Sequence, residues 1–344
     1  MAYSQEDARR LILEAGIQLL QEGLIARTWG NISARVSEDA FVITPSGIAY
    51  EHLTADDLVT VRIADNGYES AVTPSSERKI HSALYGLRKD VNFIVHTHQP
   101  LASALSLSPQ TAILTSDAPV AQREILGDQI PVARHALSGT ERLRDNLLWA
   151  ASHHPACNAM LMQHHGAICL GKDHDHAFAI AHALEAVCRN QFEAICGPYQ
   201  PPLPRQVRLS NRQFTIQYPN QEVGTVLHVT TPYVMHMSKR GRSLPPYLDD
   251  QAMIGGFVTR VASSRPSEKA LNRALRFQGA VFLQGQGALC VGPTPEDAQA
   301  MASVLEKNCL AAYYGLATGA SPVPRPYAYL ERGIYVFSYA KRNR

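Results

Sequence analysis

Two apolar runs that end in histidines are the part of this sequence best suited to chemistry. His96 and His98 follow the run 91–95, and a second run, farther along the chain, ends near His165. Residues two apart on a strand lie on the same face, so His96 and His98 can direct two imidazoles at one point. A third imidazole from the other strand end would complete three protein ligands with one open position, which is typical of a catalytic metal site.

Of the adjacent pair His164 and His165, we expect His165 to be the third ligand. Gly166 follows it directly, and a glycine allows the sharp turn that a ligand at a strand end needs. The chain contains 14 histidines, so an isolated histidine carries little weight. Three of them at two strand ends predict a divalent-metal site.

A polar segment, Ser75-Ser76-Glu77, precedes the first histidine run. By itself it is typical of a helix start, because serine caps helices and an acid in the first turn complements the helix dipole. A helix N-terminus with two hydroxyl groups is also suited to binding an anion. Glu77 can reach the predicted metal as a ligand or serve as a general acid–base.

Two turns add candidate binding groups. Gly30-Asn31 combines a backbone that can approach a ligand closely with a side-chain amide, and Thr44-Pro45-Ser46-Gly47 is a second turn of this kind. Each fragment alone is an ordinary turn. Their order along the chain, followed by the serine pair, the acid and the histidines, is what points to a site.

The elements that must position these residues alternate between helix and strand. Helical spacing predicts helices that begin at Ser4, at Ser75 or Ser76, after Thr140, and through 177–187, the first ending at Gly23. Short strands are predicted at 31–36, 40–43, 59–63, 91–95 and 159–162. Interleaved helices and strands predict an α/β layered fold.

Composition narrows the classes of function. The 344 residues fit two domains, and a net charge of +2 gives no footprint for nucleic acid. No uninterrupted apolar run approaches the ~18 residues of a membrane span. The six cysteines form no Cys-x-x-Cys pair, which favours reduced, buried thiols in a cytoplasmic protein.

The chain partly repeats itself. Residues 159–171 align with residues 280–292 at a constant offset of 121, and the same register pairs Glu185 with Glu306. In the second copy, glycine and glutamine replace the two histidines, and either His228 or His236 takes the place of His96. With the proline-rich stretch 197–204 as a linker, we expect a first domain at 1–200. The expected second domain, at 205–344, is a smaller, degenerate repeat without the metal ligands.

Six motifs, taken in order, resemble those of the class II aldolase/adducin family. The resemblance covers roughly residues 5–195. The motifs are Gly30-Asn31-Ile32-Ser33, Ile43-Thr44-Pro45-Ser46-Gly47-Ile48, Ser75-Ser76-Glu77, His96-Thr97-His98, Gly139-Thr140 and Gln163-His164-His165-Gly166.

This resemblance implies a three-layer α/β/α fold, a homo-oligomer, and a divalent metal, usually zinc and sometimes manganese. It implies that His96, His98 and His165 hold the metal and that Glu77 is a resting fourth ligand that moves off to act as acid–base. The groups implied to hold a substrate phosphate or carboxylate are Asn31, Ser46, Gly47, Ser75 and Ser76.

The activity implied is that of a lyase in carbohydrate metabolism, which cleaves or forms a C–C bond in a small phosphorylated or carboxylated sugar derivative. The reaction would pass through a metal-stabilised enediolate. Family aldolases carry a tyrosine before the Gly-Thr motif, but the stretch 114–120 has none, and His135 stands where a second tyrosine is common. Asp117 or Glu124 would then serve as the acid.

Two alternatives remain at this point. A metal-dependent decarboxylase of a 3-keto acid would use the same metal without an aldehyde partner, and the missing tyrosine favours it. A non-catalytic, adducin-like interaction module would not need the ligand set, which this chain retains.

Overall fold

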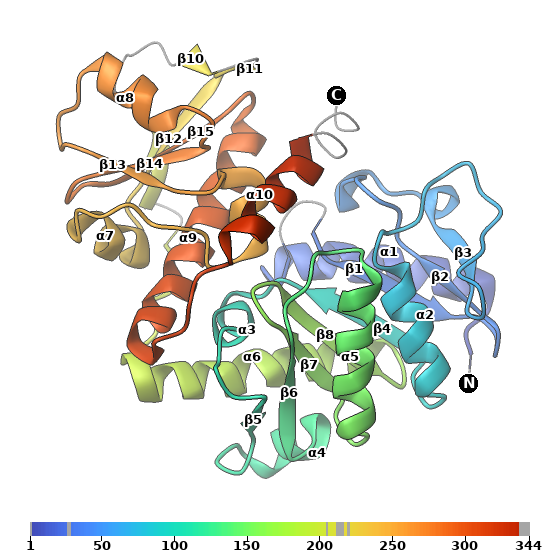
Figure 1. Cartoon of the computed structure of the whole chain (residues 1–344). Coiled ribbons are helices and arrows are strands. Elements are labelled where there is room, and N and C mark those ends of the chain that lie inside the picture. Colours follow the sequence, from blue (N-terminus) through green and yellow to red (C-terminus); the bar gives the residue numbers. More distant parts are fainter. Residues whose placement is uncertain (1, 26–28, 204–205, 211–216, 219–220, 337–344) are drawn as a thin grey trace. The chain divides into compact units, whose positions relative to one another are not determined.

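The computed structural model describes residues 2–25, 29–203, 206–210, 217–218 and 221–336 of the chain (Figure 1). The chain divides into two compact units, one up to Gln191 and one from Phe192 onward. The division falls inside one long helix, α6 (His174–Cys196), ahead of the proline-rich stretch. Each unit has its own sheet.

The first unit is built on an eight-stranded sheet in the order β3-β2-β1-β4-β8-β7-β6-β5. Its strands are β1 (Asn31–Arg35), β2 (Ala40–Ile43), β3 (Val59–Arg62), β4 (Phe93–Thr97), β5 (Ala112–Leu114), β6 (Gln129–Ala133), β7 (Ala159–Met162) and β8 (Gly166–Gly171). Its helices are α1 (Gln5–Gln21), α2 (Arg78–Leu87), α3 (Pro100–Leu105), α4 (Val120–Leu126), α5 (Glu141–His153) and α6, with short 3-10 turns η1 (Tyr50–His52) and η2 (Ala55–Asp57).

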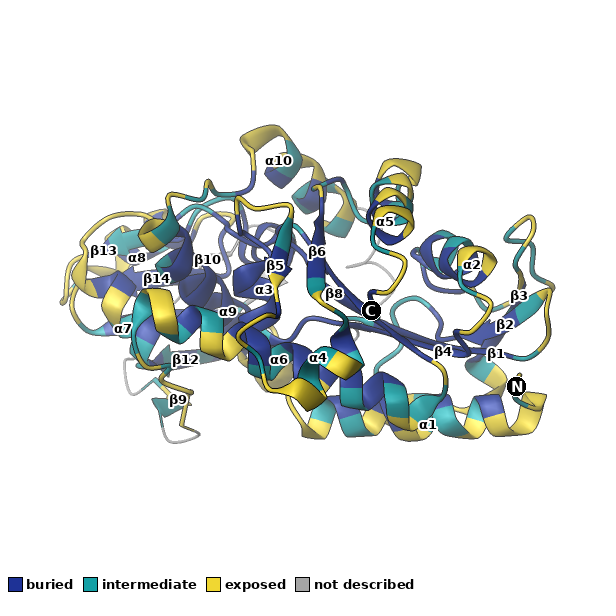
Figure 2. Ribbon diagram, turned by 90° about the horizontal axis from the view of Figure 1, so that it is seen from below, coloured by how far each residue is buried: buried dark blue, intermediate teal, exposed yellow. Residues whose placement is uncertain are grey.

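Helices cover both faces of this sheet. Figure 2 shows α2 and α5 on one face and α1 and α6 on the other. Under α2 and α5, buried residues such as Leu84 and Leu147 pack with Ile94 and Met160 of the strands. The predicted three-layer α/β/α architecture is therefore confirmed for the first unit.

Local sequence explains several boundaries. Ser4 caps α1, accepting the Asp7 N–H at 3.0 Å, and Gly23 follows the helix with a φ of 69°. The prediction that Ser75 or Ser76 caps the next helix is wrong, because Glu77 occupies the N-cap position of α2. The Ser75 hydroxyl instead accepts the Glu77 N–H at 3.3 Å. The two serines thus form the turn that leads into α2.

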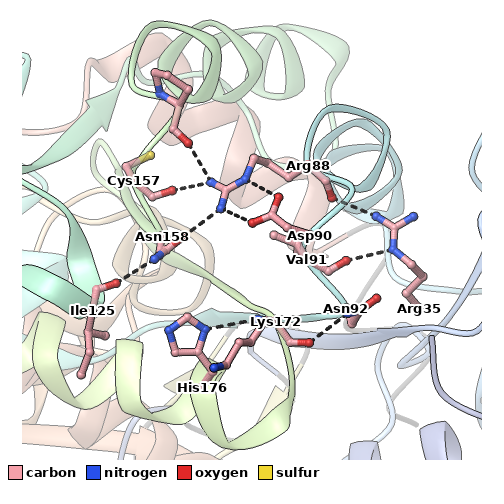
Figure 3. A network of polar contacts seen from close by, with 11 residues as sticks. Arg35, Arg88, Asp90, Val91, Asn92, Ile125, Cys157, Asn158, Lys172 and His176 are labelled. Carbon is pink, nitrogen blue, oxygen red and sulfur yellow. Dashed lines mark hydrogen bonds and ion pairs between the residues drawn. The ribbon is translucent and has the colours of Figure 1, made fainter. Parts of the chain in front are cut away.

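The far end of α2 is fixed by two arginines (Figure 3). Buried Arg35, the last residue of β1, donates to the carbonyl oxygens of Tyr85 and Arg88 at 2.8 and 3.0 Å. Arg88, the C-cap residue of α2, pairs with Asp90 at 2.7 Å and donates to the carbonyl oxygen of Cys157 at 2.8 Å. These contacts satisfy carbonyl groups at the helix end, so α2 has a defined position over the sheet.

The second unit is built on a five-stranded sheet in the order β13-β14-β15-β12-β9. Its strands are β9 (Val207–Leu209), β12 (Thr225–Val229), β13 (Arg260–Ala262), β14 (Ala280–Leu283) and β15 (Gly287–Gly292), and a separate hairpin pairs β10 (Gln217–Tyr218) with β11 (Gln221–Glu222). Its helices are α7 (Pro232–Lys239), α8 (Glu268–Leu275), α9 (Pro295–Thr318), α10 (Arg325–Ile334) and the π-helical turn η4 (Gln251–Gly255).

The five strands of the second sheet repeat the middle of the first. Antiparallel pairing places His96 opposite Ile168 in the first unit and His228 opposite Leu289 in the second. Ile168 and Leu289 are themselves equivalent at the offset of 121. The register therefore assigns the place of His96 to His228 and not to His236, which lies on α7.

Candidate active site

Three buried imidazoles meet at one end of the first sheet. His96 is at the end of β4, His98 follows that strand, and His165 lies in the turn between β7 and β8. One ring nitrogen from each lies within 4.8 Å of the others. The sheet order explains this meeting, because β4 and β8 are hydrogen-bonded neighbours although their residues are far apart in sequence.

Hydrogen bonding indicates which nitrogens face the centre. His96 Nδ1 lies 2.8 Å from the carbonyl oxygen of Ala167, so Nδ1 donates a proton to that oxygen and Nε2 faces the centre. The Nε2 atoms of His96 and His98 lie 3.0 Å apart. A carbonyl that holds the outer nitrogen of a histidine is the usual support of a metal ligand. The donor set fits a divalent cation.

Glu77 closes the group from the N-cap of α2. Its two carboxylate oxygens lie 3.4 Å from His96 Nε2 and 3.3 Å from His165 Nε2. Burial alone would raise the pKa of Glu77, but the imidazoles of His96 and His165 and the Asn31 amide hold it well below its usual value. The carboxylate is therefore charged and next to the three nitrogens.

Asn31 lies between two buried side chains of the α2 segment. Its amide nitrogen donates to Glu77 at 2.7 Å, and its amide oxygen faces His81 Nε2 at 2.5 Å. Ser138, which directly precedes the Gly139-Thr140 motif, donates a hydrogen bond from its hydroxyl to Glu77 at 3.0 Å. The contacts of His81 and Ser138 were not predicted from the sequence, because His81 resembles any residue of a helix and Ser138 any residue of a loop.

The two predicted turns and the serine pair form one rim beside Glu77. The Ser46 backbone N–H donates to the Thr73 carbonyl oxygen at 3.0 Å, and the Ser46 hydroxyl donates to the Pro74 carbonyl oxygen at 3.1 Å. Ser75 donates its N–H to the Thr44 carbonyl at 3.0 Å. Gly47 has a φ of 81°, a conformation that glycine adopts without strain. Short polar groups and backbone amides thus gather on this side of the site.

The structure also shows why a glycine follows His165. Gly166 has no positive φ; instead, a side chain there would collide with the Thr97 carbonyl oxygen on the neighbouring strand. The left-handed residue of the turn is His164, with a φ of 65°. The left-handed residue of the expected sharp turn therefore lies two residues before Gly166, and Gly166 serves close strand packing.

Comparison with known proteins identifies the family. The family model described as the class II aldolase and adducin N-terminal domain matches residues 10–192 and 213–313. The chain belongs to the class II aldolase and adducin family. The two matched stretches agree with a second, partial copy of the family domain.

Individual class II aldolases are similar to the first unit. L-fuculose phosphate aldolase from Escherichia coli (strain K12) is 34% identical over 184 residues, which are 52% of this chain and 80% of that protein. A solved L-fuculose 1-phosphate aldolase is 27% identical with a TM-score of 0.51, covering 56% of this chain and 88% of its own. A putative aldolase/epimerase/decarboxylase from Klebsiella pneumoniae is 25% identical with a TM-score of 0.50, covering 55% and 90%.

The second class II aldolase copy differs at the ligand positions. Thr230 follows β12 where His98 follows β4, and Gln286 stands where His165 stands in the first copy. His228 Nε2 is held by the Gln286 carbonyl oxygen at 2.6 Å. Within the ranges that the structure describes, His96, His98 and His165 form the one group of three side chains placed to hold a metal.

Two further observations concern the whole described chain. No helix in it is both long and apolar enough to cross a membrane. All six cysteines are free, and five of them are buried.

Proposed function

We propose that this protein is a divalent-metal-dependent lyase of the aldolase type. The substrate would be a small phosphorylated or carboxylated sugar derivative, in which a C–C bond is broken or formed. The observation that carries the proposal is the buried group of three imidazole nitrogens, within 4.8 Å of one another, beside the charged Glu77. The similarity to L-fuculose phosphate aldolase supports a phosphorylated substrate.

His96, His98 and His165 would hold the cation, for which we propose zinc, with manganese as the alternative. When bound, the cation supplies a Lewis acid for the substrate's carbonyl oxygen. His96 is pre-oriented for this by its hydrogen bond to Ala167, and burial keeps water from competing for the site.

Glu77 would move the proton. Its carboxylate is unprotonated and accepts hydrogen bonds from Asn31 and Ser138, so it can receive a proton from the substrate and return it. The rim of Ser46, Gly47, Ser75 and Ser76 would bind the substrate phosphate or carboxylate, as the motifs shared with the family imply. Asn31 would assist from its position between this rim and the metal ligands.

A metal-dependent decarboxylase of a 3-keto acid is the second candidate. The stretch 114–120 contains no tyrosine to protonate an aldehyde, and decarboxylation needs no such group. The complete ligand set in the first unit favours either reaction over an adducin-like interaction module, which needs none of these side chains.

We also propose a homo-oligomer, as is typical of the family. The six free thiols support a reducing compartment, and we propose the cytoplasm. The net charge of +2 gives no reason to add nucleic acid to the partners, and no membrane partner is proposed.

The test combines metal analysis with product detection. The purified protein should contain about one zinc or manganese per site by elemental analysis. With L-fuculose 1-phosphate and a panel of 3-keto acids, aldehyde release and carbon dioxide release separate the two reactions. Activity that survives complete removal of metal by a chelator would refute both.

Glu77→Gln tests the proposed proton carrier. The substitution keeps the size and removes the basic carboxylate, so kcat should fall by at least ~100-fold, the scale of general acid–base catalysis, while the metal stays bound. Ser82→Ala, on the same helix, is the matched control. Wild-type kcat in the Glu77→Gln protein would show that Glu77 does not carry the proton.

A further inference from the structure

A continuous line of buried hydrogen bonds runs inward from Glu77. Asn31 donates to Glu77 Oε2 at 2.7 Å, and the Asn31 amide oxygen lies 2.5 Å from His81 Nε2. On the other side of the ring, His81 Nδ1 lies 2.7 Å from the Ser33 hydroxyl, which is 2.9 Å from the Tyr85 hydroxyl. None of the five residues in this line is more than 5% exposed.

The geometry of two elements explains the line. Glu77, His81 and Tyr85 follow one another at intervals of four, so they share one face of α2. Asn31 and Ser33 are two apart on β1 and therefore share one face of that strand. Along the line, residues of α2 therefore alternate with residues of β1.

The hydrogen-bond directions follow from the orientation of the Asn31 amide. Its nitrogen lies against the Glu77 carboxylate at 2.7 Å, and its carbonyl oxygen faces His81 Nε2. That oxygen can only accept, so His81 must carry its proton on Nε2. His81 Nδ1 then accepts from Ser33, whose hydroxyl oxygen accepts from Tyr85.

The surroundings of His81 keep it in this form. Burial lowers the pKa of His81 to about 3, so the ring is neutral and has a single proton to place. The ring lies nearly parallel to Phe41, at 20° and 6.4 Å between centroids, which limits its rotation. The single Tyr85 O–H proton has two acceptors in reach, the Ser33 hydroxyl oxygen at 2.9 Å and the Ser33 carbonyl oxygen at 3.0 Å, and is shared between them.

We propose that His81 is a positioning residue that sets the orientation of Glu77 by fixing the Asn31 amide. The inference rests on the proposed function, because it assigns Glu77 the proton transfer. Without the Nε2–H donor, the Asn31 amide oxygen loses its partner, and the amide is no longer held in place against Glu77. The carboxylate would then lose a fixed donor, and its place beside His96 and His165 would no longer be defined.

Nothing in this role requires His81 to touch the substrate or to change its protonation state. Its effect reaches the reaction through Asn31 and Glu77 only. Supporting residues of this kind contribute about 10–100-fold to activity, and they act on the chemical step when the group that they hold moves a proton.

The kinetic test uses two variants of His81 in the full-length protein, with L-fuculose 1-phosphate as the probe. His81→Leu fills the space without a donor and should lower kcat by about 10–100-fold, with KM within about threefold and metal content unchanged. His81→Gln offers an amide N–H near the place of Nε2 and should restore kcat to within about fivefold of wild type.

The matched control is Ser82→Ala. Ser82 is the next residue on α2, is equally buried, and its hydroxyl has no hydrogen-bond partner among the described residues. Its loss should leave kcat unchanged. A merely structural role for His81 would lower thermal stability in His81→Leu and His81→Gln alike, without the selective recovery of kcat.

A readout without activity separates this inference from the proposed function. Nitrogen-15 NMR of histidine-labelled protein, with His81→Gln to assign the signal, should show Nε2 protonated and Nδ1 bare from about pH 5 to pH 8. A proton on Nδ1, or titration in that range, overturns the inference even if the enzyme is active. If the wild type has no lyase activity, the proposed function fails. The tautomer of His81 then still tests whether its Nε2–H donates to the Asn31 amide oxygen. His81→Leu with wild-type kcat overturns the inference as well.

Discussion

The two copies of the class II aldolase fold in this chain share a scaffold and differ in what the strand ends carry. In the first copy, β4 carries His96 and is followed by His98, whereas in the second copy β12 carries His228 and is followed by Thr230. The strand pairings are the same in both, residue for residue. The backbone therefore persists where the ligand set does not.

Among the residues that the structure describes, the second copy has no counterpart of the helix that presents Glu77. In the first unit, β2, β3 and α2 lie between β1 and β4. Between β9 and β12, the described residues contain only the β10–β11 hairpin. A glycine that packs against a neighbouring carbonyl is kept in both, as Gly166 against Thr97 and Gly287 against Val229. The comparison teaches that packing residues maintain the fold independently of the residues that do chemistry.

The strongest challenge to this comparison is to remove histidines from each copy in turn. His96→Ala/His98→Ala should abolish metal binding and lower activity by at least ~1000-fold, since a Lewis acid contributes several kcal/mol. His228→Ala should leave both unchanged. Elemental analysis and the lyase assay measure the two effects, and equal losses would mean that the second copy shares in the chemistry.

Rebuilding the ligands in the second copy would sharpen the comparison. Thr230→His/Gln286→His, together with the natural His228, should give the second unit a second metal equivalent. Activity per chain should not rise, because no residue there takes the place of Glu77. A gain in activity would show that Glu77 is dispensable.

A smaller effect concerns the equivalent acids Glu185 and Glu306. Glu185 accepts the N–H groups of Leu101 and Ala102 at 2.9 and 3.0 Å, which satisfies the first turn of α3. Glu185→Gln leaves one of these donors facing an NH₂ group and should destabilise the first unit by about 1–3 kcal/mol. Urea unfolding at pH 7.5, with hydrogen exchange at α3, measures the loss.

Glu306→Gln is the counterpart in the second unit and should not lower the free energy of unfolding at pH 7.5. Glu306 Oε1 has no hydrogen-bond partner within the described ranges, so less depends on its charge. If both substitutions destabilise equally, the second copy retains the same helix-capping contact as the first.

The smallest expected effect is a pH dependence confined to the second unit. Burial raises the pKa of Glu306 to about 7 from 4.5, so the folded state holds the proton more tightly than the unfolded state. This contribution is complete below about pH 4.5 and is lost as the pH rises through about 7, by roughly 2 kcal/mol after allowance for partial exposure. Unfolding curves from pH 5 to pH 8 should show this slope in the wild type and not in Glu306→Gln.

Much of the first unit was predictable because its signals are local. Ser4 and Gly23 mark the ends of α1, the alternation of polar and apolar residues marks β1, and a short apolar run marks β2. The helix α3 and the strand β5 were not predicted, since 6 and 3 residues are too few to show a period. The polar series Glu77, His81 and Tyr85, at intervals of four on a buried helix face, was the available signal for the hydrogen-bonded line.

The site was predictable in its residue types but not in its contacts. The sequence by itself determined that imidazoles stand at strand ends and that a copy of the segment lacks them. Only the tertiary structure placed His165 beside His96, assigned His228 and not His236 to the equivalent position, and turned Asn31 toward Glu77 and His81. The physical reason is that these distances depend on sheet order and on strand register. Both are decided by the packing of segments far apart in the chain.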